Sequence, residues 1–349
     1  MKILVCLLFI HSLWSVVLDI SPDEIVDLSS FQPLGDQIVK QTKRIYFPNY
    51  PNAYNPSLIQ VDQGFLMTFR YHPDFYNHPQ CSEIGVVLLN EHLDPVSEPQ
   101  LINTRHKRSQ TFSQSEDVRL FAYRGRVCLI FNDNIDDIED AWFAKGLRRD
   151  LFIAILSYEN GNFTLSTPQK IIYPAEYSFR PVQKNWVPFE WDKQLFLSYS
   201  LHNHLVISPN LNTGDCYACY HTTAPIEWDF GPLRGGTAAQ LVDGEYLAFF
   251  HSPKALRSSA SNGALLWHYF AGVYTFAARP PFAIQKISPF PLIAEGFYVH
   301  SSMPKRVIFP GGFVVCSDVI YLAYGKDDCE MWIATIDKKA LLDSLRRLQ

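Results

Sequence analysis

The sequence has no surplus of basic residues. Its 30 Lys and Arg residues are outnumbered by 35 Asp and Glu residues, which gives a formal net charge of −5 at neutral pH. No stripe of Lys and Arg follows any segment of the chain, whereas proteins that bind nucleic acid carry such a basic surface. We therefore expect no nucleic-acid partner.

Long helical periodicity and flexible linkers are also scarce. A chain of 349 residues could hold two domains of average size, but all-β propellers and barrels reach this length as single units. No Ser/Gly-rich segment or block of like charge marks a domain boundary. We expect one domain over residues 20–349.

Apolar runs long enough to suggest membrane insertion are confined to the N-terminus. Met1 and Lys2 precede an apolar stretch over residues 3–17, an organisation typical of a secretory signal peptide. We assign residues 1–19 to a signal peptide and expect a secreted or periplasmic protein. An uncleaved N-terminal membrane anchor is the alternative.

Cysteine is sparse and forms no complete metal-binding pattern. Removal of Cys6 with the signal peptide leaves six cysteines, an even number that would permit pairing. Cys216 and Cys219 could form a tight disulfide, a redox pair or half of a zinc site, but no second Cys-x-x-Cys completes that site. His202 and His204 alternate on a predicted strand without a third ligand in view. We expect neither a metal nor a cofactor.

Short apolar runs split by tight turns are abundant, and this pattern is typical of β-hairpins. It occurs at residues 58–70, 116–131, 186–199, 239–251 and 309–324. The turns lie at Gln63-Gly64, Arg124-Gly125, Asp192-Lys193, Asp243-Gly244 and Ser317-Asp318, a spacing of roughly 50 to 75 residues that suits the blades of a propeller. We predict an all-β fold, a five-bladed β-propeller.

The remaining segments fit around these hairpins. Apolar runs at residues 84–89, 151–156 and 332–336 suit the outer strands of blades. Residues 338–348 place leucines at helical spacing, which predicts a short C-terminal helix that docks on the body. We expect residues 18–50 and 132–149 to form rim loops that set specificity.

In a propeller the inner strand ends converge on a central channel, so distant sequence positions can share one site. Residues with useful chemistry at these ends are Arg70, Asp117, Arg119, Lys184, Asn185, His251 and Tyr274. One carboxyl group could serve as a general acid, and the cationic and hydrogen-bonding groups could hold an anion.

Strand alternation separates the two neighbouring acids of this set. Successive side chains on an extended segment point to opposite sides, so we expect only one of Glu116 and Asp117 to face the channel. A structural interpretation of Glu116 is a salt bridge with Arg119 at a blade edge.

The order of these motifs resembles glycoside hydrolase family 130, a family of five-bladed glycosidases and phosphorylases, and the related mannosyltransferase-phosphorylases. The likeness rests on Glu-Asp-Val-Arg at 116–119, Lys-Asn-Trp-Val-Pro-Phe at 184–189 and the Gly-Gly-Thr segment at 235–251, and it continues at 269–281 and 309–312. Val118 stands where the family commonly has Pro, and Ala238-Ala239 stand where Pro often follows Gly-Thr.

The resemblance implies roles for individual residues. Asp117 would be the proton donor to the glycosidic bond, with Arg119 supporting it. Arg70, Lys184, His251 and Tyr274 would bind an anion, with Asn185 beside Lys184. The implied substrate is an oligosaccharide or glycan, a β-mannoside or similar β-glycoside, with inorganic phosphate or a sugar phosphate as the second reactant.

The resemblance leaves three reactions open: inverting phosphorolysis, glycosyl transfer and hydrolysis. Hydrolysis usually needs a second carboxylate, for which Glu176, Glu190 or Glu227 would have to reach the channel. Phosphorolysis needs only the acid, because phosphate attacks the sugar. The alternative from another class is a non-catalytic, secreted glycan-binding or envelope interaction module.

Overall fold

Five antiparallel sheet units form the body of the protein, as the hairpin pattern predicted. The computed structural model describes residues 24–74, 77, 81–104, 113–133, 149–173, 182–299 and 301–348. The proposed signal peptide lies outside these residues and stays a prediction. No helix in the described ranges is long and apolar enough to span a membrane.

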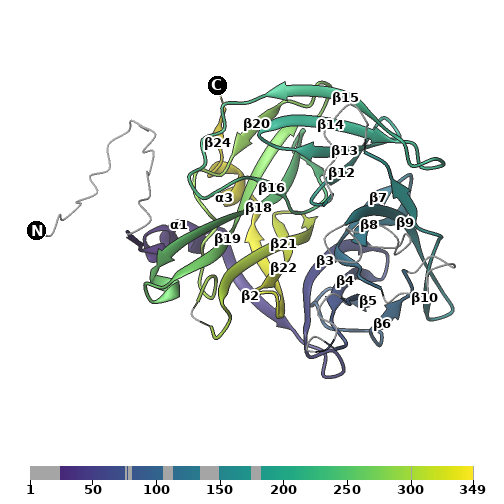
Figure 1. The fold of residues 1–349 in the computed structure, drawn as a ribbon, viewed down its shortest axis with the longest axis horizontal. Coiled ribbons are helices and arrows are strands. Elements are labelled where there is room, and N and C mark those ends of the chain that lie inside the picture. The colour runs from purple at the N-terminus through teal and green to yellow at the C-terminus, as the bar shows by residue number, and fades with distance from the viewer. Residues whose placement is uncertain are drawn as a thin grey trace, which may run out of the picture.

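Each of the five predicted hairpins supplies the two inner strands of one blade, so the five-bladed arrangement is confirmed (Figure 1). Blade one contains β3 (Ala53–Val61), β4 (Gly64–Tyr71), β5 (Glu83–Leu89) and β6 (Gln100–Ile102). Blade two contains β7 (Glu116–Tyr123), β8 (Arg126–Asp133) and β9 (Asp150–Glu159), with β10 (Asn162–Leu165) and β11 (Gln169–Ile171) both paired to β9. Blade three contains β12 (Val187–Trp191), β13 (Gln194–Ser200), β14 (Asn203–Pro209) and β15 (Cys216–Thr223).

Blades four and five are joined into one eleven-stranded sheet, because β19 and β21 pair in parallel. Blade four contains β16 (Arg234–Gly235), β17 (Gln240–Val242), β18 (Glu245–Ser258), β19 (Leu265–Ala277) and β20 (Ile284–Ile287). Blade five contains β21 (Lys305–Cys316), β22 (Val319–Lys326) and β23 (Glu330–Asp337), with β2 (Val39–Ile45) as its outermost strand.

Three of the predicted turns, at Arg124-Gly125, Asp192-Lys193 and Asp243-Gly244, have positive φ at both central residues. Asp243 and Gly244 have φ values of 47° and 88°, and Arg124 and Gly125 have 49° and 71°. Positive φ at both central positions is the geometry of type I′ turns, whose twist matches that of the flanking strands. The local turn sequences therefore set the register of these hairpins.

The ring is closed by the N-terminal strand β2, which the sequence did not predict. Its residues Val39–Ile45 pair antiparallel with Met331–Ile336 of β23, which places purple and yellow segments side by side in Figure 1. Ahead of it, β1 (Ile25–Val26) pairs with β18, and η1 (Leu28–Phe31) and α1 (Gln32–Ile38) follow. The prediction of a rim loop over residues 18–50 is therefore wrong for the described part of that segment. The loop predicted at 132–149 lies almost entirely outside the described residues.

We expect a chain that lacks residues 1–45 to lose its cooperative thermal transition. Removal of β2 leaves β23 as an open edge and takes Val39 and Ile45 out of two core clusters. Calorimetry of this truncation, beside one that lacks only residues 1–23, measures the effect. Equal melting temperatures for the two truncations would contradict this account of ring closure.

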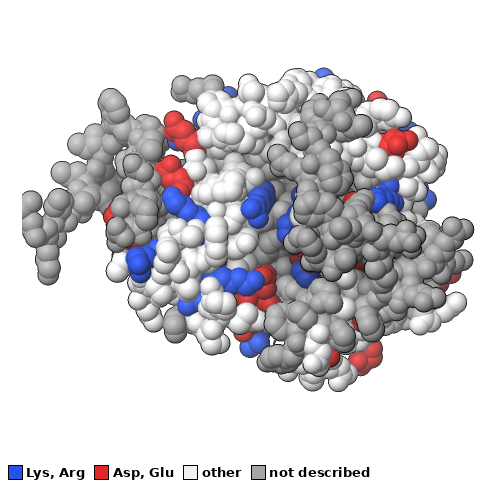
Figure 2. All heavy atoms as spheres, in the orientation of Figure 1, with Lys and Arg blue, Asp and Glu red and all other residues white. Residues whose placement is uncertain are grey.

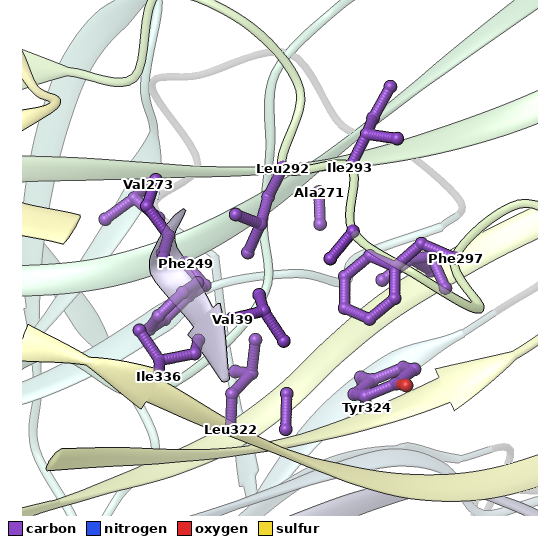
Figure 3. Close-up of a cluster of buried hydrophobic side chains, with 14 of the residues drawn as sticks. Val39, Phe249, Ala271, Val273, Leu292, Ile293, Phe297, Leu322, Tyr324 and Ile336 are labelled. Carbon is purple, nitrogen blue, oxygen red and sulfur yellow. The ribbon is translucent and has the colours of Figure 1, made fainter. Parts of the chain in front are cut away.

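The hydrophobic core is divided into five clusters, one between each pair of neighbouring blades. Figure 3 shows the cluster between blades four and five, in which Val39, Phe249, Leu322 and Ile336 point toward one another. Residues on both faces of the blades are therefore buried, which explains why these strands are apolar at successive positions rather than at alternate ones.

The C-terminal helix is present but shorter than predicted. Helix α3 (Lys338–Asp343) begins at the N-cap Asp337, whose side chain accepts a hydrogen bond from the Ala340 amide at 2.8 Å. The chain then enters β24 (Arg346–Arg347), which pairs with β20. Leu341 and Leu348 consequently pack on different clusters instead of one helix face.

Cys128, Cys216, Cys219, Cys316 and Cys329 are free thiols in the described part of the chain. Cys216 and Cys219 do not form a disulfide, so the tight-disulfide interpretation of this motif is wrong. Cys128 is buried in the core between blades two and three, where its thiol acts as a small apolar group.

Candidate functional site

The inner strands of the blades meet around the start of β7, which contacts β3, β12 and β21. Three non-glycine residues near this point have left-handed backbones: Asn55, Asp117 and Asn185, with φ values of 48°, 50° and 66°. All three are buried. They occupy equivalent positions at the start of the inner strands of blades one, two and three, and such backbone strain is concentrated at functional sites.

A β-bulge places Asp117 in this site. Glu116 pairs with Asn132 and Arg119 with Ile130, so two residues of β7, Asp117 and Val118, stand opposite the single residue Phe131 of β8. The bulge breaks strand alternation, and both acids reach the guanidinium of Arg70. The prediction that only one of Glu116 and Asp117 faces the site is therefore wrong.

The Asp117 carboxylate is held by groups from neighbouring strands. Its Oδ1 accepts a hydrogen bond from Nδ2 of Asn55 at 2.9 Å and lies 3.6 Å from Nη1 of Arg70. Burial by itself raises the pKa of this carboxyl group, but Arg70, Lys184 and Arg119, together with the Asn55 hydrogen bond, outweigh burial. The net pKa of Asp117 lies below its ordinary value, so the free site holds an ionised carboxylate at neutral pH.

Glu116 lies in an ion-pair network with two arginines. Its Oε1 lies 3.0 Å from Nη2 of Arg70 and 3.2 Å from Nε of Arg149, and its Oε2 accepts a hydrogen bond from Asn132 at 3.2 Å. The predicted partner, Arg119, does not take part. Arg70 is thus held between two carboxylates, which offset its charge.

Arg119 supports the site through buried hydrogen bonds. Its guanidinium donates to the carbonyl oxygens of Asp117 at 2.8 Å, Gly235 at 3.2 Å and Gly236, and to Oδ1 of Asn185 at 3.0 Å. Burial lowers the pKa of Arg119 to about 10, while Asp117 raises it, so the side chain stays charged at neutral pH. Arg119 therefore ties blade two to blades three and four beneath Asp117.

Lys184 and Arg234 line a cavity of about 310 Å³ on the blade-three side of Asp117. Asn185, Tyr199 and Gly235 contribute to the same wall. Among the residues that the structure describes, no carboxylate lies within salt-bridge distance of Lys184 or Arg234. The face shown in Figure 2 carries several Lys and Arg side chains near the middle of the molecule. Within the described part of the cavity wall, Lys184 and Arg234 are therefore available to an anionic ligand.

His251 lies beside this cavity but is neutral. Its ring is 4.7 Å from that of Phe309 between centroids, and its backbone pairs with Arg234. Burial, followed by the charges of Arg119 and Arg234, holds the pKa of His251 well below its ordinary value. His251 can therefore offer a hydrogen bond to an anion but not a charge.

Two other predicted features lie elsewhere. Tyr274 is fully buried in the core between blades three and four, against Phe250 and Phe276, because it lies on β19, the third strand of its blade rather than the inner one. The structure does not bring Tyr274 into the site, so its predicted role in binding is not supported.

His202 and His204 do not share a face, since His202 is exposed and buried His204 forms a hydrogen bond with Ser198 at 2.9 Å.

The acids proposed as a second carboxylate do not approach Asp117 in the described residues. Glu190 accepts a hydrogen bond from the Arg124 amide at 2.7 Å, at the hairpin turns, and exposed Glu227 pairs with Arg346 at 3.2 Å. Glu176 lies outside the described residues. Glu116 is the described carboxylate nearest in the sequence to Asp117, and both contact Arg70.

Sequence reasoning missed Asn55, Arg149 and Arg234. A signal for Asn55 exists, because Asn55-Pro56-Ser57 opens the inner strand of blade one as Asp117-Val118-Arg119 opens that of blade two. Both sequences span a bulge in their strands. Arg149 and Arg234 lie outside the hairpins, and nothing local marks them.

Comparison by sequence finds no relative, since no model of a known protein family matches the chain and no curated protein matches it. Comparison by structure finds many. A putative glycoside hydrolase from Bacteroides ovatus superposes with a TM-score of 0.60 and 15% identity, over 88% of this chain and 96% of that one. β-1,2-Mannobiose phosphorylase from Listeria innocua, solved with β-1,2-mannobiose, gives a TM-score of 0.56 and 14% identity over 88% and 96%.

A third similar structure is a protein of the GH130 family of mannoside phosphorylases. That family contains glycoside hydrolases that target β-1,2-mannosidic linkages in Candida mannan. This third structure superposes with a TM-score of 0.55 and 13% identity over 92% of this chain and 93% of that one. The fold of this chain is therefore GH130-like, as the order of its motifs indicated. Identities this low establish the fold alone.

Proposed function

We propose that this protein is a glycoside-active enzyme that acts on β-mannosides or similar β-glycosides, with Asp117 as the proton donor. The observation that carries the proposal is the buried Asp117, placed by a bulge where the inner strands of several blades meet. The GH130-like fold supports the same assignment, since its solved examples include enzymes of mannoside cleavage.

Among the three reactions, we favour inverting phosphorolysis or its reverse. Lys184, whose charge acts on Asp117, and Arg234 line one cavity and can hold a phosphate, whereas Glu116 is already engaged by Arg70 and Arg149. A phosphate oxygen would attack the anomeric carbon, the bond to the leaving oxygen would break, and that oxygen would take the proton of Asp117. Glycosyl transfer and hydrolysis remain the other forms of the proposal.

A bound anion would also prepare Asp117 for this role. A general acid must be protonated, yet the cations around Asp117 hold its pKa below the ordinary value in the free site. A phosphate near Lys184 would offset part of the positive charge that favours the carboxylate. The proton is therefore expected to bind to Asp117 more readily when phosphate is present.

The first test is phosphate dependence with variants of the two unpaired cations. We expect cleavage of β-linked manno-oligosaccharides by the purified protein to require phosphate. Lys184→Gln and Arg234→Gln should each raise the KM for phosphate about tenfold or more, since a hydrogen bond to a charged group contributes about 1.5–3 kcal/mol. Arg126→Gln, at an exposed hairpin turn, changes the net charge equally and should leave the KM for phosphate unchanged.

If the protein cleaves manno-oligosaccharides at the same rate with and without phosphate, the reaction is hydrolysis and the phosphorolysis form of the proposal is wrong. The ionised state of Asp117 in the free site specifically favours the second candidate function, a non-catalytic glycan-binding module. Retained mannoside binding without turnover, in the presence and absence of phosphate, would support that module and overturn the enzyme proposal.

A further inference from the structure

Both contacts that other described residues make with the Asp117 carboxylate reach the same oxygen, Oδ1. Asn55 donates its Nδ2 hydrogen bond to Oδ1 at 2.9 Å, and Nη1 of Arg70 lies 3.6 Å from Oδ1. An ionised carboxylate only accepts hydrogen bonds, so the amide nitrogen of Asn55 has to face it. Oδ2 thus lies outside this pair of contacts.

Blade five leaves space behind the Asn55 side chain through a glycine, Gly325. A Cβ at Gly325 of β22 would lie 1.9 Å from Oδ1 of Asn55 and 2.9 Å from its backbone nitrogen. Glycine at position 325 therefore leaves just enough room for the amide. The backbone of Asn55 is left-handed, a conformation that asparagine tolerates better than most residues.

We propose that Asn55, backed by Gly325, is a positioning residue that reserves Oδ1 of Asp117 for hydrogen bonds and leaves Oδ2 as the oxygen that carries the transferable proton. This inference rests on the proposed role of Asp117 as proton donor. Blade two supplies the proposed proton donor Asp117, and residues of blades one and five orient its carboxyl group.

The other charged and titratable groups around Asp117 do not provide this orientation. They are Tyr54 of β3, Arg70 of β4, His72 directly after β4, Glu116 and Arg119 of β7, Lys184 ahead of β12 and His251 of β18. Arg70 also contacts Glu116, and Arg119 donates to the backbone carbonyl of Asp117 rather than to its carboxylate. The short, directed contact to one carboxylate oxygen comes from Asn55.

The test is the pH profile of kcat/KM for Asn55→Gly, a change that keeps the backbone freedom and removes the amide. Donation to the ionised form lowers the pKa of Asp117, so loss of the amide should move the alkaline limb of the profile upward by about one pH unit and lower kcat about tenfold. Gly325→Ala, which displaces the intact Asn55 amide, should shift the limb in the same direction. Asn55→Asp should shift it further, because a second carboxylate would face the first.

Asn160→Gly is the matched control, since Asn160 is an exposed left-handed asparagine at the turn between β9 and β10. It should leave the profile unchanged. An unchanged alkaline limb in Asn55→Gly and Gly325→Ala, with both variants folded as judged by melting temperature, overturns the inference.

A titration that needs no substrate separates this inference from the proposed function. Protein labelled with carbon-13 at the aspartate carboxyl groups gives an Asp117 signal, identified by its absence in Asp117→Asn. The pKa read from that signal should rise in Asn55→Gly, and an unchanged value overturns the inference whether or not the protein is active. Absence of turnover on every mannoside, with the pKa shifted as expected, would instead overturn the proposed function alone.

Discussion

We expect Asp117→Asn to lower kcat for mannoside cleavage by about 10²–10⁴-fold, because the proposed role of Asp117 is that of a positioned general acid. Asparagine keeps the shape of the side chain but has no acidic proton for the leaving oxygen. The contacts that Asn55 and Arg70 make with Oδ1 place the carboxyl group in the bulge of β7, so the variant should still fold and bind substrate. Initial rates at saturating substrate, with KM measured separately, test the prediction.

The matched control for this variant is Asp192→Asn. Asp192 also has a left-handed backbone, with φ 48°, but is exposed at the turn between β12 and β13, so its variant should keep full activity. An Asp117→Asn protein with near wild-type kcat would show that another group donates the proton.

Arg119→Leu lowers the free energy of unfolding by about 3–5 kcal/mol, the scale on which removal of one member of a buried charged network acts. The substitution leaves the carbonyl oxygens of Gly235 and Gly236 and the amide oxygen of Asn185 without their buried donor. Each unsatisfied buried acceptor costs about 1–3 kcal/mol. Unfolding in urea, followed by intrinsic fluorescence, measures the loss.

Two comparisons make this stability prediction specific. Arg126→Leu removes an exposed arginine from the same blade and should change the free energy of unfolding by less than about 0.5 kcal/mol. Arg119→Lys should recover only part of the loss, because an ammonium group cannot reach the several acceptors that the planar guanidinium contacts. A loss below about 1 kcal/mol in Arg119→Leu would mean that water replaces the guanidinium without cost.

The fold was predictable because its signals are local. Asp243-Gly244 is a dipeptide that favours a tight turn by its local sequence and has positive φ here, and apolar runs on both sides define the hairpin. Closure of the ring was not predictable, since the pairing of β2 with β23 joins residues about 300 positions apart through the geometry of the whole ring. Nothing in Val39–Ile45 itself identifies its partner.

The site was predictable only in part, for a related reason. Asp117, Arg119, Lys184 and Asn185 lie together because each opens or precedes an inner strand. Alternation failed at Glu116, because a bulge that depends on packing against neighbouring blades changed the direction of the next side chain.

Tyr274 was misplaced for a different reason. The sequence gives the residues of a strand but not the position of that strand within its blade, and β19 is the third strand of blade four, next to β18. Whether a cationic side chain is free to bind an anion also depends on its partners in the folded protein. Arg70 is paired with two carboxylates, whereas Arg234 lines the cavity beside Lys184.

The most direct test of the central claim is a proton NMR time course of the purified protein with β-1,2-mannobiose and inorganic phosphate. Inverting phosphorolysis with Asp117 as the acid predicts accumulation of α-mannose 1-phosphate and mannose in equal amounts, and no product with Asp117→Asn. Unchanged mannobiose in the presence of demonstrated binding, or the same product formed by Asp117→Asn at the wild-type rate, would contradict it.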